Sequence, residues 1–155
     1  MNPVKVSTRS RYGLRAMLEL ALKYGQGPVM MQSIARNQGI SRKYLDTIFT
    51  ALKNAGLVHS RRGVGGGHVL AKPPEQIRLG DVLRAVEGPV SLVDCIGAPA
   101  LCARAHRCVT RDIWSEVGRA IEQVLDGVTL ADLVQKHVDK QPSVPDADPE
   151  RCTLG

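Results

Sequence analysis

Residues 35–48 read ARNQGISRKYLDTI, and their spacing is typical of a helix-turn-helix. Ala35 is small enough to let two helices cross closely, and Gly39 can adopt the positive φ that a tight turn needs. Leu45 and Ile48 are then placed to seat the second helix against the first. This stretch therefore predicts two helices joined by a short turn.

The surrounding sequence supplies the rest of a helical unit. Residues 7–24 carry apolar side chains at helical spacing and predict an amphipathic helix, and residues 31–38 predict a shorter one. Ser41 is a good N-cap for a third helix, which we expect to run to about Ala55. The expected fold class is therefore mainly α.

A glycine-rich hairpin is expected after the third helix. Residues 57–62 and 68–71 are short strand candidates, and they flank the glycine-rich tip at 63–67. Two helices followed by such a hairpin indicate a winged helix-turn-helix, whose second helix enters the major groove of DNA. The tip lacks the Lys-Ser/Thr of a P-loop and does not match the dinucleotide fingerprint, so nucleotide binding is disfavoured.

Candidate DNA contacts lie at the start of the recognition helix and on the wing. Arg42 and Lys43 suit phosphates or guanine, and Asp46 can accept a hydrogen bond from cytosine N4. Basic residues at the base of the wing suit phosphates or a minor groove. The full set is Ser41, Arg42, Lys43, Tyr44, Asp46, Thr47, Arg61, Arg62 and Gly65. The alternative is an ordinary solvated basic face.

The charge distribution favours a duplex partner. Residues 1–78 hold 13 Lys and Arg against 3 acidic residues, a net +10, whereas residues 79–155 hold 8 against 12, a net −4. A basic half joined to an acidic half indicates a polyanion-binding module attached to something else. Only 3% of the residues are aromatic, which disfavours binding of single strands by base stacking.

Several other classes of protein are disfavoured. No apolar run approaches the roughly 20 residues of a membrane-spanning helix. The apolar stretch at 16–22 is broken by Glu19 and lacks a signal-peptide cleavage pattern, so we expect a cytoplasmic protein without a membrane partner. No Ser/His/Asp grouping or carboxylate pair indicates an enzyme or a small-molecule substrate.

The chain is expected to divide into four parts. A winged helix-turn-helix domain occupies residues 1–89, and an irregular, cysteine-containing loop occupies residues 90–110. A long helix and a short one follow over residues 111–138. Residues 139–155 are rich in Pro, Asp and Ser with little apolar content, so this tail is expected to be disordered.

Cys95, Cys102 and Cys108 lie together in the second of these parts. In a reducing compartment, such a cluster indicates metal or redox chemistry before a disulfide framework. Soft thiolate ligands select iron–sulfur clusters, zinc or copper(I). The spacing matches no zinc ribbon, although His106 can complete a Cys3His zinc site. An iron–sulfur cluster, zinc and unmetallated redox-active thiols all stay open. Cys152, in the tail, is either incidental or a fourth ligand.

Several stretches together resemble one known family. The chain resembles the bacterial iron–sulfur cluster regulators of the Rrf2 family, which includes IscR-like, nitric-oxide-sensing and iron-responsive repressors. The resemblance covers about residues 4–137 without large gaps. The matching stretches are RYGLRAML at 11–18, ISRKYL at 40–45, LKNAGLV at 52–58, RGVGGG at 62–67, LGDVLRAVEG at 79–88, the three cysteines and VTRDIW at 109–114.

The resemblance implies a homodimer held by the long helix after the cysteines. It implies a dyad-symmetric operator in double-stranded DNA and a [2Fe–2S] or [4Fe–4S] cluster on Cys95, Cys102 and Cys108. The implied function is a repressor that senses iron or iron–sulfur status, oxygen, redox state or nitric oxide. The alternative is a winged-helix regulator whose cysteine loop binds zinc, senses thiols or contacts a protein without a cluster.

The sequence departs from the family pattern at the fourth ligand and in the DNA-binding half. IscR-like proteins have a histidine ligand three residues after the third cysteine, where this chain has Arg111. Nitric-oxide sensors can use an acidic residue of the partner's first helix, a region that reads TRSR at 8–11 here. His106, Cys152, a backbone or water oxygen, or a small molecule therefore remain candidates. Asp46 replaces the usual, longer Glu of IscR-like members, which bears on the class of operator. His68 stands in the wing where the family usually has Tyr, and we interpret this as a packing change.

Overall fold

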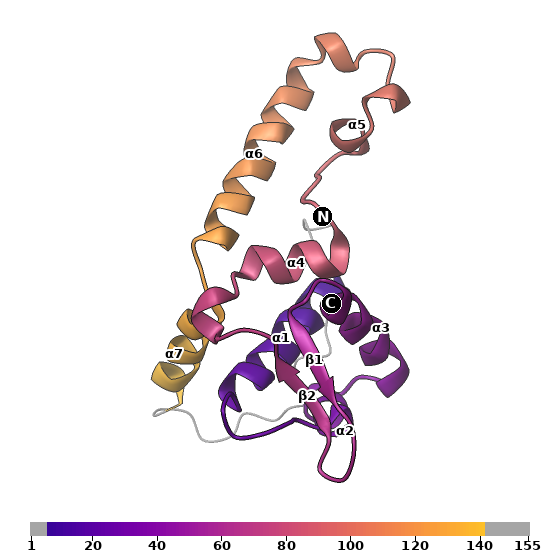
Figure 1. Cartoon of the computed structure of the whole chain (residues 1–155). Coiled ribbons are helices and arrows are strands. Elements are labelled where there is room, and N and C mark those ends of the chain that lie inside the picture. Colours follow the sequence, from indigo (N-terminus) through magenta and orange to yellow (C-terminus); the bar gives the residue numbers. More distant parts are fainter. Residues whose placement is uncertain (1–5, 142–155) are drawn as a thin grey trace.

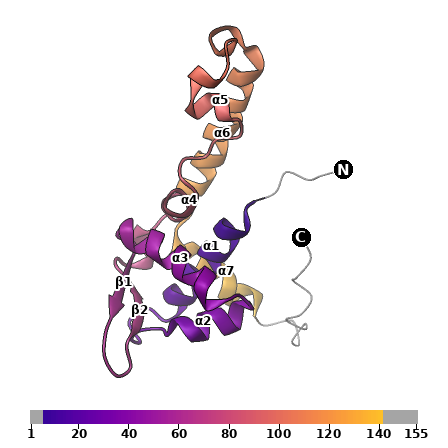
Figure 2. The same ribbon diagram turned by 90° about the vertical axis from the view of Figure 1, so that its right-hand side faces the viewer.

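Helices make up most of the chain, and one hairpin stands beside them. The structure is a computed structural model that describes residues 6–141. A head holds the hairpin and most helices. Residues 90–126 rise from it as an arm, which is built around one long helix (Figures 1 and 2). The elements are α1 (Thr8–Leu22), α2 (Met31–Gln38), α3 (Arg42–Asn54), β1 (Val58–Arg61), β2 (Gly67–Leu70), η1 (Pro74–Gln76), α4 (Leu79–Glu87), α5 (Asp94–Gly97), η2 (Pro99–Leu101), η3 (Ala105–Arg107), α6 (Val109–Asp126) and α7 (Leu130–Lys140). The expected winged helix-turn-helix fold is confirmed.

The turn between α2 and α3 forms as its residues predict. Gly39 adopts a left-handed conformation, with φ +62°, and ends α2. The Ser41 hydroxyl then accepts a hydrogen bond from the Tyr44 amide at 3.2 Å and caps α3. A left-handed glycine followed by an N-cap serine sets the angle between the two helices.

The wing is an antiparallel hairpin docked on a third segment. Val58 pairs with Leu70 and Arg61 with Gly67 at the two ends of the register. On its other edge, His68 exchanges two backbone hydrogen bonds with Val29, at 2.8 and 2.9 Å. A Cβ on Gly67 would lie 2.4 Å from the Val29 carbonyl oxygen, so this close approach requires glycine.

One hydrophobic core joins the elements of the head. α1 contributes Met17 and α3 contributes Ile48 and Phe49, all of them buried. α4 packs against both α1 and α3, and Leu130 of α7 completes the same core. The recognition helix is therefore held by α4 as well as by the other helices of the turn.

The arm differs in detail from the sequence-based expectation. Residues 90–110 were expected to be irregular, but they contain α5, η2 and η3. Pro99 at the first position of η2 favours such a turn, because its φ suits a helix start. α6 begins at Val109 rather than Arg111, with Cys108 as its N-cap, and α7 continues to Lys140. The tail from residue 142 and Cys152 lie outside the described residues. None of the described helices is both long and apolar enough to cross a membrane.

An ion-pair cluster joins the arm to the head. The Arg84 guanidinium of α4 donates to both carboxylate oxygens of Asp126 at the end of α6, at 2.7 and 3.2 Å, and to Asp81 at 2.9 Å. A Cβ on Gly80 would lie 1.9 Å from an Asp126 carboxylate oxygen. The glycine therefore leaves the space in which the carboxylate reaches Arg84. The hydrogen bonds of Arg84 lower the pKa of Asp126.

Asp126→Asn is expected to destabilise the protein at neutral pH but not in acid. Because the folded-state pKa of Asp126 is depressed, its ion pair stabilises the fold above the ordinary aspartate pKa of about 4. That contribution is lost as the pH falls through the lowered folded pKa. We expect Tm to fall by about 2 °C or more at neutral pH and not to change at about pH 2, as measured by thermal denaturation. Glu116→Gln on α6 is the control, and an equal loss at both pH values would contradict the prediction.

Candidate nucleic-acid interface and cysteine loop

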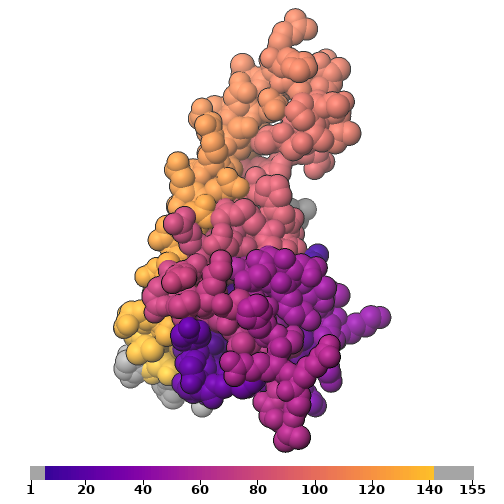
Figure 3. Space-filling model, viewed as in Figure 1, coloured from indigo at the N-terminus to yellow at the C-terminus, as the bar shows by residue number. Residues whose placement is uncertain are grey.

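α3 places one face in the core and the other in solvent. Leu45 and Ile48 are fully buried, whereas Arg42, Lys43 and Asp46 are exposed on the other side of the helix. The recognition helix lies at the surface of the head, with the wing projecting below it (Figures 1 and 3). Its basic first turn is thus presented outward.

Some of the predicted contact residues around the start of α3 also bond or pack within the head. The Ser41 hydroxyl serves as the N-cap, and Thr47 Oγ1 donates to the Tyr44 carbonyl at 2.7 Å. Tyr44 is half-buried and packs edge-to-face on Tyr12 of α1, with ring centroids 6.3 Å apart. These residues orient the start of the helix, while Arg42 carries its charge outward.

α1 adds a cation that the sequence reasoning did not assign to the interface. The Arg15 guanidinium lies 5.8 Å from the centroid of the Tyr12 ring, in a cation–π arrangement. Because Tyr12 contacts Tyr44, Arg15 lies near the N-terminal end of α3. The signal in the sequence was the spacing of Tyr12 and Arg15, which places both on one face of α1.

The wing presents its basic residues at the tip end of β1 and not at the base of the wing, where they were expected, because Arg61 pairs with Gly67 next to the tip. Arg61, Arg62 and Gly65 are exposed, and Gly65 has a φ of +74° that the tip requires. On the inner side, the His68 ring lies 4.5 Å from the Phe49 ring, centroid to centroid. Burial, followed by the charge of nearby Lys53, lowers the pKa of His68. A neutral His68 therefore packs the wing onto α3.

The three predicted cysteine ligands lie at the far end of the arm from the wing (Figure 1). All three are half-buried thiols without a disulfide: Cys95 on α5, Cys102 after η2 and Cys108 at the start of α6. Cys108 Sγ lies 3.1 Å from Thr110 Oγ1, and that hydrogen bond, followed by one from the Arg111 backbone, lowers the thiol pKa. The side chain of Arg111 donates from Nε to the Cys95 carbonyl at 3.0 Å.

The chemistry of these donors suits a soft metal or cluster, but the described conformation does not assemble a site. Within residues 6–141, no three His, Cys, Asp or Glu side chains are grouped so that they could hold a metal ion. His106 is exposed on η3, and Arg111 replaces the family's histidine and bonds to a backbone carbonyl. Residues 95–108 would have to close around a bound group. The thiolates themselves remain suitable ligands.

α6 exposes an apolar stripe along most of its length. Trp114, Val117, Ile121 and Val124 recur at intervals of three, four and three residues, the spacing of one coiled-coil seam. Val117 and Ile121, in the middle of the stripe, are 39% and 37% exposed. Among the residues of α6, only Gly118 is buried. Such a stripe on an otherwise solvated helix is characteristic of a helix–helix interface.

The winged fold and the basic outer face of its recognition helix define a DNA-binding protein of the winged helix-turn-helix class. A family model described as Rrf2, iron-dependent transcriptional regulator, matches residues 6–136. The chain belongs to the Rrf2 family of transcription regulators, as its sequence motifs indicated. The expectation of a regulator rather than an enzyme is confirmed, because the relatives are named transcription regulators.

The similar proteins include two differently named regulators. The HTH-type transcriptional regulator CymR of Bacillus subtilis strain 168 is 42% identical over 130 residues, which are 84% of this chain and 89% of CymR. A solved structure of T. potens IscR has a TM-score of 0.75 at 39% identity and covers 92% of this chain and 94% of that chain. A solved structure of B. subtilis CymR, described as the global cysteine regulator, has a TM-score of 0.71 at 41% identity and covers 86% and 98% of the two chains.

Proposed function

We propose that this regulator is a cytoplasmic, homodimeric repressor of a dyad-symmetric operator whose DNA binding responds to an iron–sulfur cluster on Cys95, Cys102 and Cys108. The observation that carries the sensor part is the position of these thiols. They occupy one short segment at the start of α6, and the opposite end of that helix is joined to the DNA-binding head. A change in this segment therefore acts on the helix that links it to the head.

The DNA contacts are proposed to divide by role. Arg42, Lys43 and Asp46 read base edges from the major groove, together with Thr47, which is exposed one turn after Lys43. Arg61 and Arg62 bind phosphates or a minor groove of the DNA. Gly65, which has no side chain, allows the wing tip to approach the sugar–phosphate backbone of the DNA. Ser41 and Tyr44 orient the helix through the cap and the Tyr12 contact.

The dimer is proposed to form through the apolar stripe of α6. Two such stripes facing one another would bury Val117 and Ile121 from both subunits. The two recognition helices must then lie about 34 Å apart to read successive major grooves. Because α6 contacts α4, and α4 packs against α3, a rotation of the arm alters that spacing.

The cysteines would hold the cluster, and Cys108 is best prepared for this role. Its hydrogen bond to Thr110 favours the thiolate, which is the form that binds a metal. A bound cluster would supply a redox-sensitive and nitric-oxide-sensitive link between the three thiolates. The fourth ligand is proposed to come from His106, Cys152, a backbone or water oxygen, or a small molecule.

The sensor is tested on the full chain after anaerobic purification. We expect iron and sulfide in the purified protein, together with visible absorption, and both should be lost in Cys102→Ala. Operator binding should respond to oxygen, nitric oxide or iron chelation in the wild type and not in that variant. Cys152→Ser tests the tail thiol as the fourth ligand, and Glu116→Gln, at an exposed position of α6, is the control. Stoichiometric zinc without iron would overturn the cluster proposal.

A second candidate function is a thiol sensor without a cluster. The observation that favours it is the lowered pKa of Cys108, since a thiolate is the nucleophilic form of cysteine. The relation to CymR, a protein described as a cysteine regulator, also favours it. This candidate predicts operator binding that changes with disulfide stress in metal-free protein, with Cys108→Ser abolishing the response.

A further inference from the structure

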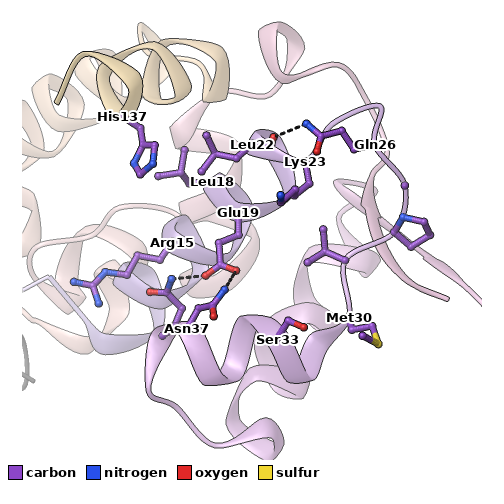
Figure 4. Close-up of a pocket in the computed structure, with 14 residues that line it drawn as sticks. Arg15, Leu18, Glu19, Leu22, Lys23, Gln26, Met30, Ser33, Asn37 and His137 are labelled. Atoms are coloured by element: carbon purple, nitrogen blue, oxygen red, sulfur yellow. Dashed lines mark hydrogen bonds between the residues drawn. The ribbon is translucent and has the colours of Figure 1, made fainter. Parts of the chain in front are cut away.

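A groove that the cysteine loop does not use, and that shares Arg15 with the nucleic-acid interface, lies between α1, α2 and α7 (Figure 4). Its volume is about 720 Å³, which falls in the usual range for small-molecule sites, about 300–1,000 Å³. α1 forms one wall, α2 the opposite wall, and His137 of α7 closes one end.

Apolar side chains line much of the groove. Leu18 and Leu22, one turn apart on α1, are only half-buried, and so is Val29. Met30 is 59% exposed at the opening. An apolar chain placed on these residues would remove their surface from water, which is favourable.

A pre-oriented carboxylate lies in the groove beside these residues. The side-chain amides of Asn37 and Gln38, both from α2, donate to the two oxygens of Glu19 of α1, the first of them at 3.2 Å. Figure 4 shows this carboxylate held between the two helices. A carboxylate oxygen can accept more than one hydrogen bond, so Glu19 retains capacity for a further donor.

Cations flank this carboxylate along α1. Lys23 lies one turn after Glu19 and Arg15 one turn before it, and all three line the groove. Lys23 is exposed, which leaves its ammonium accessible to a ligand. The groove therefore offers an acceptor for a positive group and donors for a negative group within one helical turn, next to an apolar surface.

We infer that this groove binds a small zwitterion with an apolar side chain, namely an α-amino acid. Its ammonium group would bind Glu19, its carboxylate would bind Lys23, and its side chain would lie on Leu18 and Leu22. A simple carboxylate would leave Glu19 facing a like charge, and a simple amine would meet Lys23 and Arg15. Only the zwitterion satisfies both kinds of group.

Occupation of the groove would act on the helix-turn-helix. α2 is its first helix, and α7 follows directly on the arm, so a ligand between them ties the two together. This regulatory consequence rests on the proposed function, whereas the binding itself does not. Amino-acid binding and operator binding are therefore measured separately.

Isothermal titration of the full chain with L-leucine tests the binding. We expect one site per chain, and at least about ten-fold weaker binding of 4-methylpentanoate, which lacks the ammonium, and of isopentylamine, which lacks the carboxylate. Glu19→Gln and Lys23→Gln should each weaken L-leucine binding by a similar factor. Glu75→Gln, which removes an exposed carboxylate outside the groove, should leave it unchanged.

Two further measurements make the test decisive. Thermal denaturation of each variant establishes that it is folded, and a thermal-shift screen of the twenty amino acids covers the choice of side chain. The inference is overturned if none of them raises Tm, if 4-methylpentanoate binds as tightly as L-leucine, or if Glu19→Gln binds L-leucine normally. Operator binding by the ligand-free wild type separates the two hypotheses: normal operator binding without any amino-acid binding would overturn the groove proposal and leave the proposed function standing.

Discussion

The double variant Arg42→Ala and Lys43→Ala is expected to lose operator affinity by at least 100-fold. Both side chains are exposed on the first turn of α3, whose opposite face is fully buried. Each base or phosphate contact of this kind contributes about 1–3 kcal/mol, and a dimer presents each of them twice. Because neither side chain packs in the core, the variant should keep the wild-type Tm.

Fluorescence anisotropy measures this loss on an operator first selected from random DNA by the wild-type protein. The dependence of affinity on salt should also become less steep in the variant, because fewer counterions are released on binding. Lys136→Ala is the matched control, since it removes an exposed cation from α7 rather than from the recognition surface. Unchanged affinity in the double variant at several salt concentrations would exclude α3 as the reading helix.

The second large effect is expected from Val117→Asp combined with Ile121→Asp. In a dimer, these substitutions would place four carboxylates in one apolar seam, and burying unpaired charge is highly unfavourable. We expect the dimer dissociation constant to rise by more than 100-fold, so that sedimentation or light scattering detects a monomer. Operator affinity should fall to that of a single half-site.

The monomeric variant should still fold, because the same residues are already more than one-third exposed in the single chain. Gln123→Asp is the control: it adds a carboxylate to α6 on the side away from the stripe and should leave the dimer intact. A dimer of unchanged stability in the double variant would show that the subunits do not associate through α6.

The sequence predicted the head with high accuracy because its signals are local. The Ser41 cap, the Gly39 turn and the apolar spacing that ends in Leu45 and Ile48 each depend on residues within a few positions of one another. The glycine-rich tip likewise predicted the wing. Where the prediction missed, at α5, η2 and η3, the segment lacks a continuous helical periodicity, and its short turns pack little into the core.

The site was predicted less completely, because several side chains take their roles from distant partners. Tyr44 stays a predicted DNA contact, and only the fold shows that its ring also packs on Tyr12 of a different helix. His68 was identified as a packing difference, and its partner proved to be Phe49 of the recognition helix. Arg111 was known to replace a ligand, but only the fold shows its bond to the Cys95 carbonyl.

By itself, the sequence determined the winged helix-turn-helix, its outward basic residues and its family, because caps, turns and apolar periods are written in neighbouring residues. Only the tertiary structure decided how α6 joins the head and what lies between α1, α2 and α7. Arg84 and Asp126 are 42 residues apart in the chain, and their pairing depends on the space left by Gly80. The Glu19 carboxylate is oriented by amides on another helix. Such contacts follow from packing, which brings together residues that no local pattern relates.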